Sequence, residues 1–315
     1  MRTKFFILFL AVAAFAIAAN PPVLKFKNGN FKIVQFTDVH WNTAAKSKLK
    51  NDSTLMVIRA VLDAEKPDMV IFTGDVVVSK GVLKGWDDLL VPIEERKIPF
   101  AVTFGNHDTE TDLPKEKILE YLMKNPYNLT TDAGRGIDGV GNCVLPIFDS
   151  KGKKDLWNLY LFDSNAYTND STLGYYDWVK KSQINWYVDQ SNKIKEREDR
   201  VVPALAFFHI PVPEYEYVRL QKSTPGNKTE QVCSPAVNSG LFFAFMKQKD
   251  VKATFVGHDH NNDFVGTLGG IKLCYGRKTG FNSYGSLERG GRVIELKPDG
   301  EMTTHVRTMS GVYLP

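Results

Sequence analysis

The sequence contains little of what would mark several classes of protein. Only 3 of its 315 residues are cysteines, so at most one disulfide bond can form and a disulfide-stapled scaffold is excluded. None of them lies in a motif typical of a nucleophilic cysteine, and the sequence does not show which two would pair. The three are Cys143, Cys233 and Cys274. Blocks of like charge are also absent: the formal charge is +4, and the run 193–200 mixes signs like a solvated helix end. We therefore expect no nucleic-acid partner.

Long apolar runs are absent as well, except at the start of the chain. Arg2 and Lys4 precede an unbroken apolar run, residues 5–19, which ends in small residues and is followed by Asn20. This pattern predicts a cleavable signal peptide over residues 1–19, and the run is short for a membrane-spanning helix. We expect a protein that is secreted or lies in the lumen of the secretory or endolysosomal pathway, without a stable membrane anchor.

Four N-x-[ST] sequons agree with that expectation, although chance alone produces some. All lie in polar stretches that we expect at the surface, where a glycan could be attached. The four acceptors are Asn51, Asn128, Asn169 and Asn227.

What the chain does contain is a regular alternation of strand-like and helix-like segments. Strands are expected at residues 31–36, 68–72, 98–104, 158–162, 204–208 and 253–256. Helices are expected at residues 55–62, 82–96, 112–123, 182–194 and 238–246, the first capped by Ser53 or Thr54, the fourth capped by Ser182, and the second bent or shortened by Pro92. This alternation favours an α/β fold, and the strand-rich end of the chain adds antiparallel pairing. We predict a single domain over residues 20–315.

The ends of the expected strands carry most of the chain's histidines. Five of the six follow such strands, accompanied by aspartate and asparagine. The polar residues at these ends are Asp38, His40, Asp75, Asn106, His107, His209, His258 and His260. A single histidine of this kind is more often hydrogen-bonded in the core or exposed than a metal ligand, and that is what we expect of His305, which lies outside the pattern. The evidence for a metal site is that residues of this kind follow five separate strands.

These side chains have the chemistry of a metal centre. In open α/β sheets, ligands bind outside the carboxyl ends of the strands, so the groups are expected to converge. Imidazole, carboxylate and amide oxygen form a mixed ligand set suited to zinc, iron or manganese. Eight such groups exceed the needs of one ion. They suit two ions with a bridging carboxylate, an arrangement that favours phosphoryl displacement.

The motifs resemble the calcineurin-like metallophosphoesterase superfamily over about residues 31–264. The resemblance rests on Asp38-x-His40, Gly74-Asp75, Gly105-Asn106-His107-Asp108, the strand before His209, and Gly257-His258-Asp259-His260, in that order. Residues 257–264 and 273–275 further resemble the non-purple relatives of purple acid phosphatases. The resemblance implies a four-layer α/β/β/α sandwich of two mixed sheets, with the site between the edges of the sheets.

The resemblance also implies a role for each residue. The first metal would take Asp38, His40, Asp75 and His260. The second would take Asp75, Asn106, His209 and His258, with Asp75 as the bridge. His107 matches the family's non-ligand histidine, which hydrogen-bonds the substrate or protonates the leaving oxygen. Asp108 is expected to orient that histidine, because a carboxylate partner fixes the tautomer of a ring.

One position departs from the purple members of the family. They have a tyrosine three residues after the bridging aspartate, and this chain has Val78, which cannot bind a metal. His40 would supply the third protein ligand in its place, as in colourless members. The resemblance therefore implies a complete site, and it no longer implies a ferric–divalent pair.

The expected activity is hydrolysis of phosphomonoesters, with a phosphorylated small molecule or phosphoprotein as substrate and a metal-bound hydroxide as nucleophile. A phosphodiesterase or nucleotidase on the same core is an alternative, because the same ligand set serves both bonds. Candidate substrate contacts are Asn106, His107 and Arg277, the last by bidentate pairing with phosphate. An inactive binding protein is the other alternative; it would predict damaged ligands, and none is damaged. The sequence does not indicate an oligomeric state.

Overall fold

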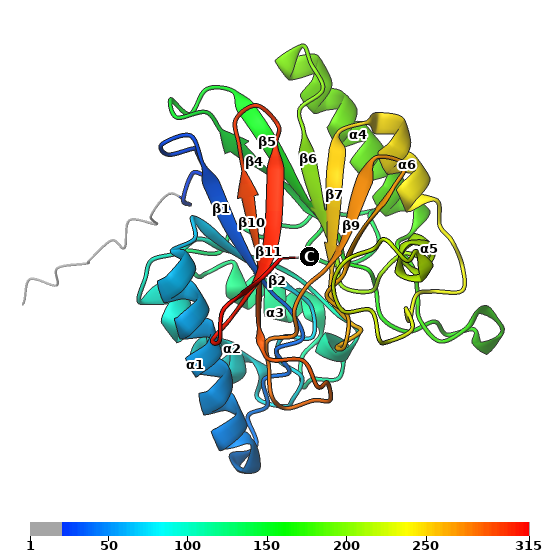
Figure 1. Ribbon diagram of the computed structural model, residues 1–315. Coiled ribbons are helices and arrows are strands. Elements are labelled where there is room, and N and C mark those ends of the chain that lie inside the picture. The colour runs from blue at the N-terminus through cyan, green and yellow to red at the C-terminus, as the bar shows by residue number, and fades with distance from the viewer. Residues whose placement is uncertain (1–20, 315) are drawn as a thin grey trace, which may run out of the picture.

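Two mixed β-sheets of six strands each lie face to face in the computed structural model, which describes residues 21–314 (Figure 1). The first sheet has the order β12-β11-β10-β1-β2-β3 and the second β4-β5-β6-β7-β9-β8. The strands of the first are β1 (Phe31–Phe36), β2 (Met69–Thr73), β3 (Phe100–Thr103), β10 (Gly290–Leu296), β11 (Met302–Thr308) and β12 (Val312–Tyr313). Those of the second are β4 (Cys143–Phe148), β5 (Asp155–Leu161), β6 (Ala204–Phe207), β7 (Val251–Val256), β8 (Val265–Leu268) and β9 (Ile271–Tyr275). The predicted signal peptide lies outside the described residues.

Helices cover the outer face of each sheet, so the molecule has four layers (Figure 1). The first sheet is covered by α1 (Lys48–Glu65), α2 (Val82–Glu94) and α3 (Lys115–Leu122). The second is covered by α4 (Lys181–Glu198), α5 (Glu214–Leu220) and α6 (Leu241–Gln248). The predicted α/β/β/α sandwich of two mixed sheets is confirmed. No helix within residues 21–314 is both long enough and apolar enough to cross a membrane.

The central strands are apolar on both faces because each sheet is buried on both sides. In β2, Met69 and Ile71 join the apolar cluster between the two sheets, while Val70 and Phe72 pack under the helices. The inner cluster takes residues from both sheets, including Ile33 of β1 and Phe207 of β6. Burial on both faces explains why these strands appear in the sequence as unbroken apolar runs.

The parallel strands of each sheet place the site. β1, β2 and β3 run parallel to one another, as do β5, β6, β7 and β9. Each parallel strand therefore delivers the residue after its last position to the same edge of its sheet. The antiparallel strands β10 to β12 extend the first sheet beyond β1, and the antiparallel strands β4 and β8 form the two edges of the second sheet.

Several expected helix ends were wrong. α1 begins at Lys48, upstream of the expected caps, so the sequon at Asn51 lies inside a helix. The polar stretch before Ser53 is not a loop: it forms the first turns of α1, in which Lys48, Lys50 and Asp52 are exposed and Asn51 is buried. α4 begins at Lys181, with Lys180 rather than Ser182 at the N-cap. α2 begins at Val82 as expected, contains Pro92 and ends at Glu94, short of the expected end at Arg96.

The three cysteines all lie within residues 21–314, and none is disulfide-bonded there. Cys143 and Cys274 are buried, and Cys233 is half-buried. Burial raises the pKa of each thiol above its ordinary value. This agrees with the expectation that no cysteine is a nucleophile.

Candidate metal centre

Seven side chains of metal-ligand type converge where the edges of the two sheets meet. Three strands of the first sheet and two of the second each end directly before one or two of them. Asp38 and His40 follow β1, Asp75 follows β2, Asn106 follows β3, His209 follows β6, and His258 and His260 follow β7. His305, by contrast, lies on β11, where its Nε2 atom is 3.5 Å from Oε1 of Glu65.

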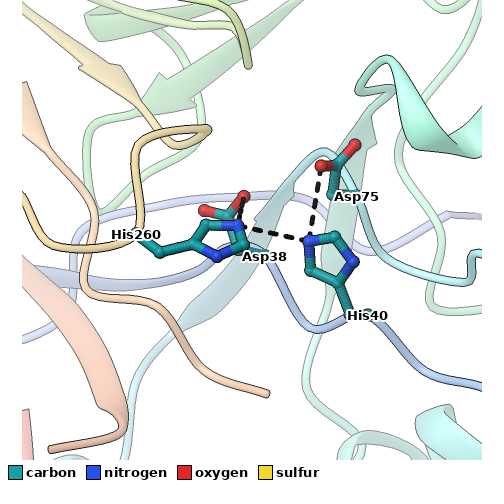
Figure 2. Close-up of side chains that lie close together, drawn as sticks. All are labelled: Asp38, His40, Asp75 and His260. Carbon is teal, nitrogen blue, oxygen red and sulfur yellow. Dashed lines mark hydrogen bonds and ion pairs between the residues drawn. The ribbon is translucent and has the colours of Figure 1, made fainter. Parts of the chain in front are cut away.

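A first group of four side chains points toward one position, as Figure 2 shows. Nε2 of His40 lies 3.3 Å from Nε2 of His260 and 3.5 Å from Oδ2 of Asp75. Nε2 of His260 lies 3.3 Å from Oδ1 of Asp38. All four residues are buried, and their ligand atoms lie within 4.8 Å of one another. Two imidazole nitrogens facing each other at this distance, beside two carboxylates, form a cage for a cation.

A second group shares Asp75 with the first. Oδ2 of Asp75, the oxygen that faces His40, also lies 3.3 Å from Nε2 of His209. The ring of His258 packs against His209, with centroids 5.1 Å apart. Asn106, in the loop after β3, is held near Asp75, because the next residue, His107, donates its backbone N–H to Oδ1 of Asp75 at 2.9 Å. One carboxylate oxygen therefore faces both groups.

Three buried polar atoms of the second group have no hydrogen-bond partner among the described residues. They are Oδ1 of Asn106, Nε2 of His209 and Nε2 of His258. A buried polar atom without a partner is costly, and such atoms in a native site call for a missing ligand. The donor set and these atoms fit a bound metal ion.

Hydrogen bonds on the far side of two rings fix which nitrogen is free. Nδ1 of His209 lies 2.8 Å from the carbonyl oxygen of Thr73, and Nδ1 of His260 lies 3.1 Å from that of Tyr284. A carbonyl can only accept, so each Nδ1 carries a proton and Nε2 is the nitrogen that faces the site.

The backbone around the site adopts conformations that most residues avoid. Asp38, His40, Asp75 and His258 have φ values of 51°, 46°, 50° and 82°. Such strain persists where the surrounding structure enforces it, and it concentrates at functional sites. Close approach matters too: a Cβ on Gly74 would lie 2.4 Å from the ring of His209, so only glycine fits there.

Charge and burial set the protonation of the site. Burial lowers the pKa of His40 and of His258 to about 3, so both rings are neutral near pH 7. Burial alone would raise the pKa of Asp38 and Asp75, but neighbouring histidines, His260 and His209 respectively, hold both below the ordinary value. Burial would likewise lower the pKa of His209, yet Asp75 raises it to about 10. A cation beside Asp75 would repel that proton, so metal binding is expected to release it.

Asp108 does not orient His107, and that prediction was wrong. Its buried carboxylate instead accepts hydrogen bonds from the backbone N–H groups of Gly105, Asp75 and Val76, at 2.7, 2.8 and 3.0 Å. Asp108 therefore ties the loop after β2 to the loop after β3. Burial and the nearby Asp75 raise the pKa of Asp108 to about 7. The carboxylate beside His107 is Glu110, with Oε2 lying 2.9 Å from Nδ1.

Arg277 is not available to a phosphate, so this candidate substrate contact was also wrong. Its side chain is 3% exposed and is paired with the carboxylate of Asp263. Nη1 donates to the carbonyl oxygen of Glu288 at 2.8 Å. The guanidinium is thus committed to holding the segments around β8 and β9.

Several residues around the centre were missed in the sequence. Lys278 is buried and donates from Nζ to the carbonyl oxygen of Asp38 at 3.1 Å. The ring of Tyr284 stacks on His260 with centroids 4.0 Å apart, and Tyr167 bonds to Asn106. Among these residues and Glu110, only Glu110 could have been found from the sequence. It lies three residues after His107, and residues three apart in a helical turn share a face.

Comparison with known proteins agrees with this geometry. A family model described as "Calcineurin-like phosphoesterase" matches residues 31–262. "Probable inactive purple acid phosphatase 29" from Arabidopsis thaliana is 35% identical over 92% of this chain and 84% of that protein. "Phosphatase DCR2" from Saccharomyces cerevisiae is 33% identical over 79% of this chain but only 48% of that protein.

Two solved structures show the same fold at low sequence identity. A dimetal phosphatase from Danio rerio aligns with a TM-score of 0.58 at 12% identity, covering 90% of this chain and 97% of that one. The purple acid phosphatase PPD1 from yellow lupin aligns with a TM-score of 0.54 at 15% identity, covering 91% and 54%.

Proposed function

Because the chain belongs to the calcineurin-like phosphoesterase family, we propose that it is a metal-dependent phosphoric ester hydrolase acting on phosphomonoesters. The observation that carries this proposal is the Oδ2 atom of Asp75, which faces both His40 and His209. A shared carboxylate between two groups of ligands is the arrangement that two-ion phosphoryl chemistry needs.

The two groups assign the ligands. Asp38, His40, Asp75 and His260 would hold one ion, and Asp75, Asn106, His209 and His258 the other. Iron, zinc and manganese all suit this nitrogen and oxygen set. When bound, the two ions would lower the pKa of water and neutralise charge on the phosphoryl oxygens.

The protein's own residues supply the rest of the chemistry. The ring of His107 lies beside that of His40, with centroids 5.4 Å apart, and its side chain is 40% exposed. Nδ1 is occupied by Glu110, which leaves Nε2 as the free edge of the ring. As the phosphorus–oxygen ester bond breaks, a proton on Nε2 would pass to the leaving oxygen, and the alcohol would depart neutral.

Activity of the metal-loaded protein tests the proposal. Purified protein loaded with manganese, zinc or iron should hydrolyse an aryl phosphate, and a chelator should abolish the reaction. His107→Ala should keep its metal and lose turnover. If wild type and Asp75→Ala are equally inert with all three metals, the proposal fails. A comparison of phosphomonoesters with phosphodiesters would decide whether the diesterase alternative is correct.

An inactive binding protein remains the competing function, since three Arabidopsis relatives are named as probable inactive purple acid phosphatases. In this chain every candidate ligand position holds a residue that can bind a metal. Val78 stands where the purple members of the family have a tyrosine, and its hydrocarbon side chain cannot bind a metal. Measurement of metal content separates the two: about two ions per chain favours the enzyme, and none favours the binding protein.

We also propose that the chain is secreted or enters the lumen of the secretory or endolysosomal pathway. The proposal is supported by the basic start, the apolar run 5–19 and its small-residue end. Its substrate would then be a phosphorylated small molecule or phosphoprotein of those compartments. Fractionation of cells that express the full chain tests this, and retention in the cytosol would contradict it.

A further inference from the structure

The carboxylate of Glu110 is connected to both polar side chains that follow β3. Oε2 lies 2.9 Å from Nδ1 of His107, and Oε1 accepts a hydrogen bond of 2.7 Å from the hydroxyl of Tyr167. That hydroxyl in turn accepts a hydrogen bond of 2.8 Å from Nδ2 of Asn106. Glu110 therefore contacts His107 directly and reaches Asn106 through one tyrosine.

The chemistry of these groups fixes which atom donates and which accepts in each hydrogen bond of the network. An ionised carboxylate can only accept, so the proton of Tyr167 points at Glu110 and its oxygen is left to accept from Asn106. The amide of Asn106 must then present its nitrogen to Tyr167 and its oxygen to the other side. That oxygen, Oδ1, is buried and has no partner within residues 21–314. By the same rule, Nδ1 of His107 carries the proton that faces Glu110, so the second proton of the doubly protonated ring sits on Nε2, where it can pass to a leaving oxygen.

We propose that Glu110 is the positioning residue of this centre. It turns Oδ1 of Asn106 toward the second group of ligands and holds His107 with Nε2 free for the leaving oxygen. Tyr167 is its connection to Asn106. The inference rests on the proposed phosphoesterase function and assigns to Glu110 the role that the sequence had suggested for Asp108. Glu110 touches none of the candidate metal ligands directly, so it acts through its neighbours.

Tyr167 is held in place independently of Glu110. It lies in a short hairpin in which the backbone N–H of Thr168 donates to the carbonyl of Tyr175 at 3.1 Å. Its ring stacks on Tyr176, with centroids 6.1 Å apart, and Tyr176 meets the ring of His258 edge-on at 4.5 Å. The hairpin thus contacts two members of the second group, Asn106 and His258, and presents the Tyr167 hydroxyl to Glu110 in a fixed place.

The alternative is that His107 and Glu110 form a surface ion pair that has no effect on catalysis. His107 and Glu110 have side chains 40% and 49% exposed, and such pairs add little to stability. The alternatives predict different effects of Glu110→Ala. If the pair has no role, the substitution leaves catalysis unchanged. If Glu110 is needed only for folding, the substitution lowers the rate on every substrate alike. A residue that positions a proton donor matters most where the leaving oxygen needs a proton.

Kinetics with two leaving groups therefore tests the proposal. Glu110→Ala should lower kcat on an alkyl phosphate by about 10-fold to 100-fold, the range for lost supporting contacts. On 4-nitrophenyl phosphate, whose leaving oxygen departs without a proton, kcat measured at saturating metal, where a weaker contact to Asn106 does not limit the rate, should change less than about 3-fold. Glu110→Gln can still accept from His107 and should recover most of the alkyl phosphate rate. Glu116→Ala, an exposed glutamate of α3, is the matched control and should match wild type. Equal losses on both substrates, or no loss, would overturn the proposal.

Nitrogen NMR of the histidine rings tests the contact without any activity. In metal-free protein, at a pH where the spectrum shows the neutral ring, His107 should carry its proton on Nδ1. In Glu110→Ala the proton should shift toward Nε2. An unchanged tautomer would refute the positioning role even in an active enzyme. If wild type is inactive with every metal, the proposed function falls, and the NMR result still decides the role of Glu110.

The branch through Tyr167 has its own test. Tyr167→Phe removes the hydroxyl that holds Asn106, so calorimetric titration with Zn²⁺ should show one of two sites losing about 10-fold or more in affinity. Tyr175→Phe removes an exposed hydroxyl from the same hairpin and should bind like wild type. Equal affinities for wild type and Tyr167→Phe would overturn this branch.

Discussion

Oδ2 of Asp75 lies 3.3 Å from Nε2 of His209, across the line where the two sheets meet. Asp75 follows β2 of the first sheet and His209 follows β6 of the second, so neither sheet could form this pair alone. The pair is assembled when the sheets pack through their shared apolar cluster. A metal ion that binds there binds only the folded chain, and it should stabilise the fold by mass action.

The shared oxygen predicts different metal losses for different variants. Asp75→Asn should bind neither ion, because both groups lose their common carboxylate. His209→Ala should lose only the ion of the second group, since the first group keeps its own residues. Metal content by mass spectrometry after loading and desalting checks both. His305→Ala, which removes a histidine outside the site, should bind as wild type does. An Asp75→Asn protein that still holds two ions would show that the groups are independent.

Asp108→Ala should be strongly destabilising. Its buried carboxylate accepts from the backbone of Gly105, Asp75 and Val76, and alanine would leave these N–H groups without a partner. We expect a loss of about 3 kcal/mol or more in the free energy of unfolding, measured in urea.

Asp112→Ala is the matched control for that experiment. The carboxylate of Asp112 also accepts from two backbone N–H groups, those of Gly81 and Val82, but it is exposed. Water can replace it there, so the loss should be much smaller. Equal losses for the two variants would mean that burial of the Asp108 contacts does not matter.

Acid should weaken the fold through Glu65. Its side chain, 3% exposed on α1, pairs with Lys32 of β1 at 2.9 Å and with Arg307 of β11 at 2.5 Å. Burial alone would raise the pKa of Glu65, but the hydrogen bonds with Lys32 and Arg307 lower it below the ordinary value. The stability contributed by these pairs is therefore fully present above about pH 4.3 and is lost as the pH falls through the folded-state pKa.

Urea unfolding of metal-free protein between about pH 7 and pH 3 checks this expectation. Glu65→Gln should be less stable than wild type by about 2 kcal/mol at neutral pH, and the difference should shrink in acid. Metal-free protein is needed because acid also protonates the candidate metal ligands. A difference that stays constant to the lowest pH would rule out ionisation of Glu65 as the cause.

Sequence reasoning located the candidate site but misjudged side-chain direction. The convergence of Asp38, Asp75 and His209 was predictable, because carboxyl ends of parallel strands share one edge of a sheet. The role of Asp108 was not, because adjacency in sequence says nothing of which way a side chain points. The turn of 3₁₀ helix at His107–Thr109 directs Asp108 back to the loop after β2 and brings Glu110 onto the side of His107.

The predicted exposure of two sequons and the predicted phosphate contact of Arg277 were wrong for a related reason. Composition predicts that polar residues are exposed, yet Asn51 and Asn128 are each 8% exposed. Both are buried by contacts with residues that the local sequence does not reveal. Asn51 donates to the carbonyl of Asn42 at 2.8 Å, and Arg277 is buried against Asp263. Tertiary contacts decide burial, and a short window of sequence cannot supply them.

The same burial predicts which sequon can carry a glycan. Asn51 and Asn128 are too buried for a sugar, and Nδ2 of Asn227 lies 3.1 and 3.0 Å from the two carboxylate oxygens of Asp263. Asn169 is exposed, and its side chain makes no hydrogen bond within the described residues. If the full chain enters a secretory pathway, we expect correctly folded protein to be glycosylated at Asn169.

Glycosidase treatment of secreted protein checks this choice among the four sequons. Removal of the glycan should lower the mass of wild type, and Asn169→Gln should show no such shift. Asn227→Gln is the informative control, because its sequon is also at the surface and differs by the contact with Asp263. It should keep the full shift, since Nδ2 of Asn227 is already held. A glycan on Asn128 would require the chain around β3 to open, because a backbone bridge to Phe100 holds Asn128 beside that strand and its Nδ2 donates to the carbonyl of Thr130 at 3.0 Å. Folded, active protein with a sugar at that position would contradict the burial argument.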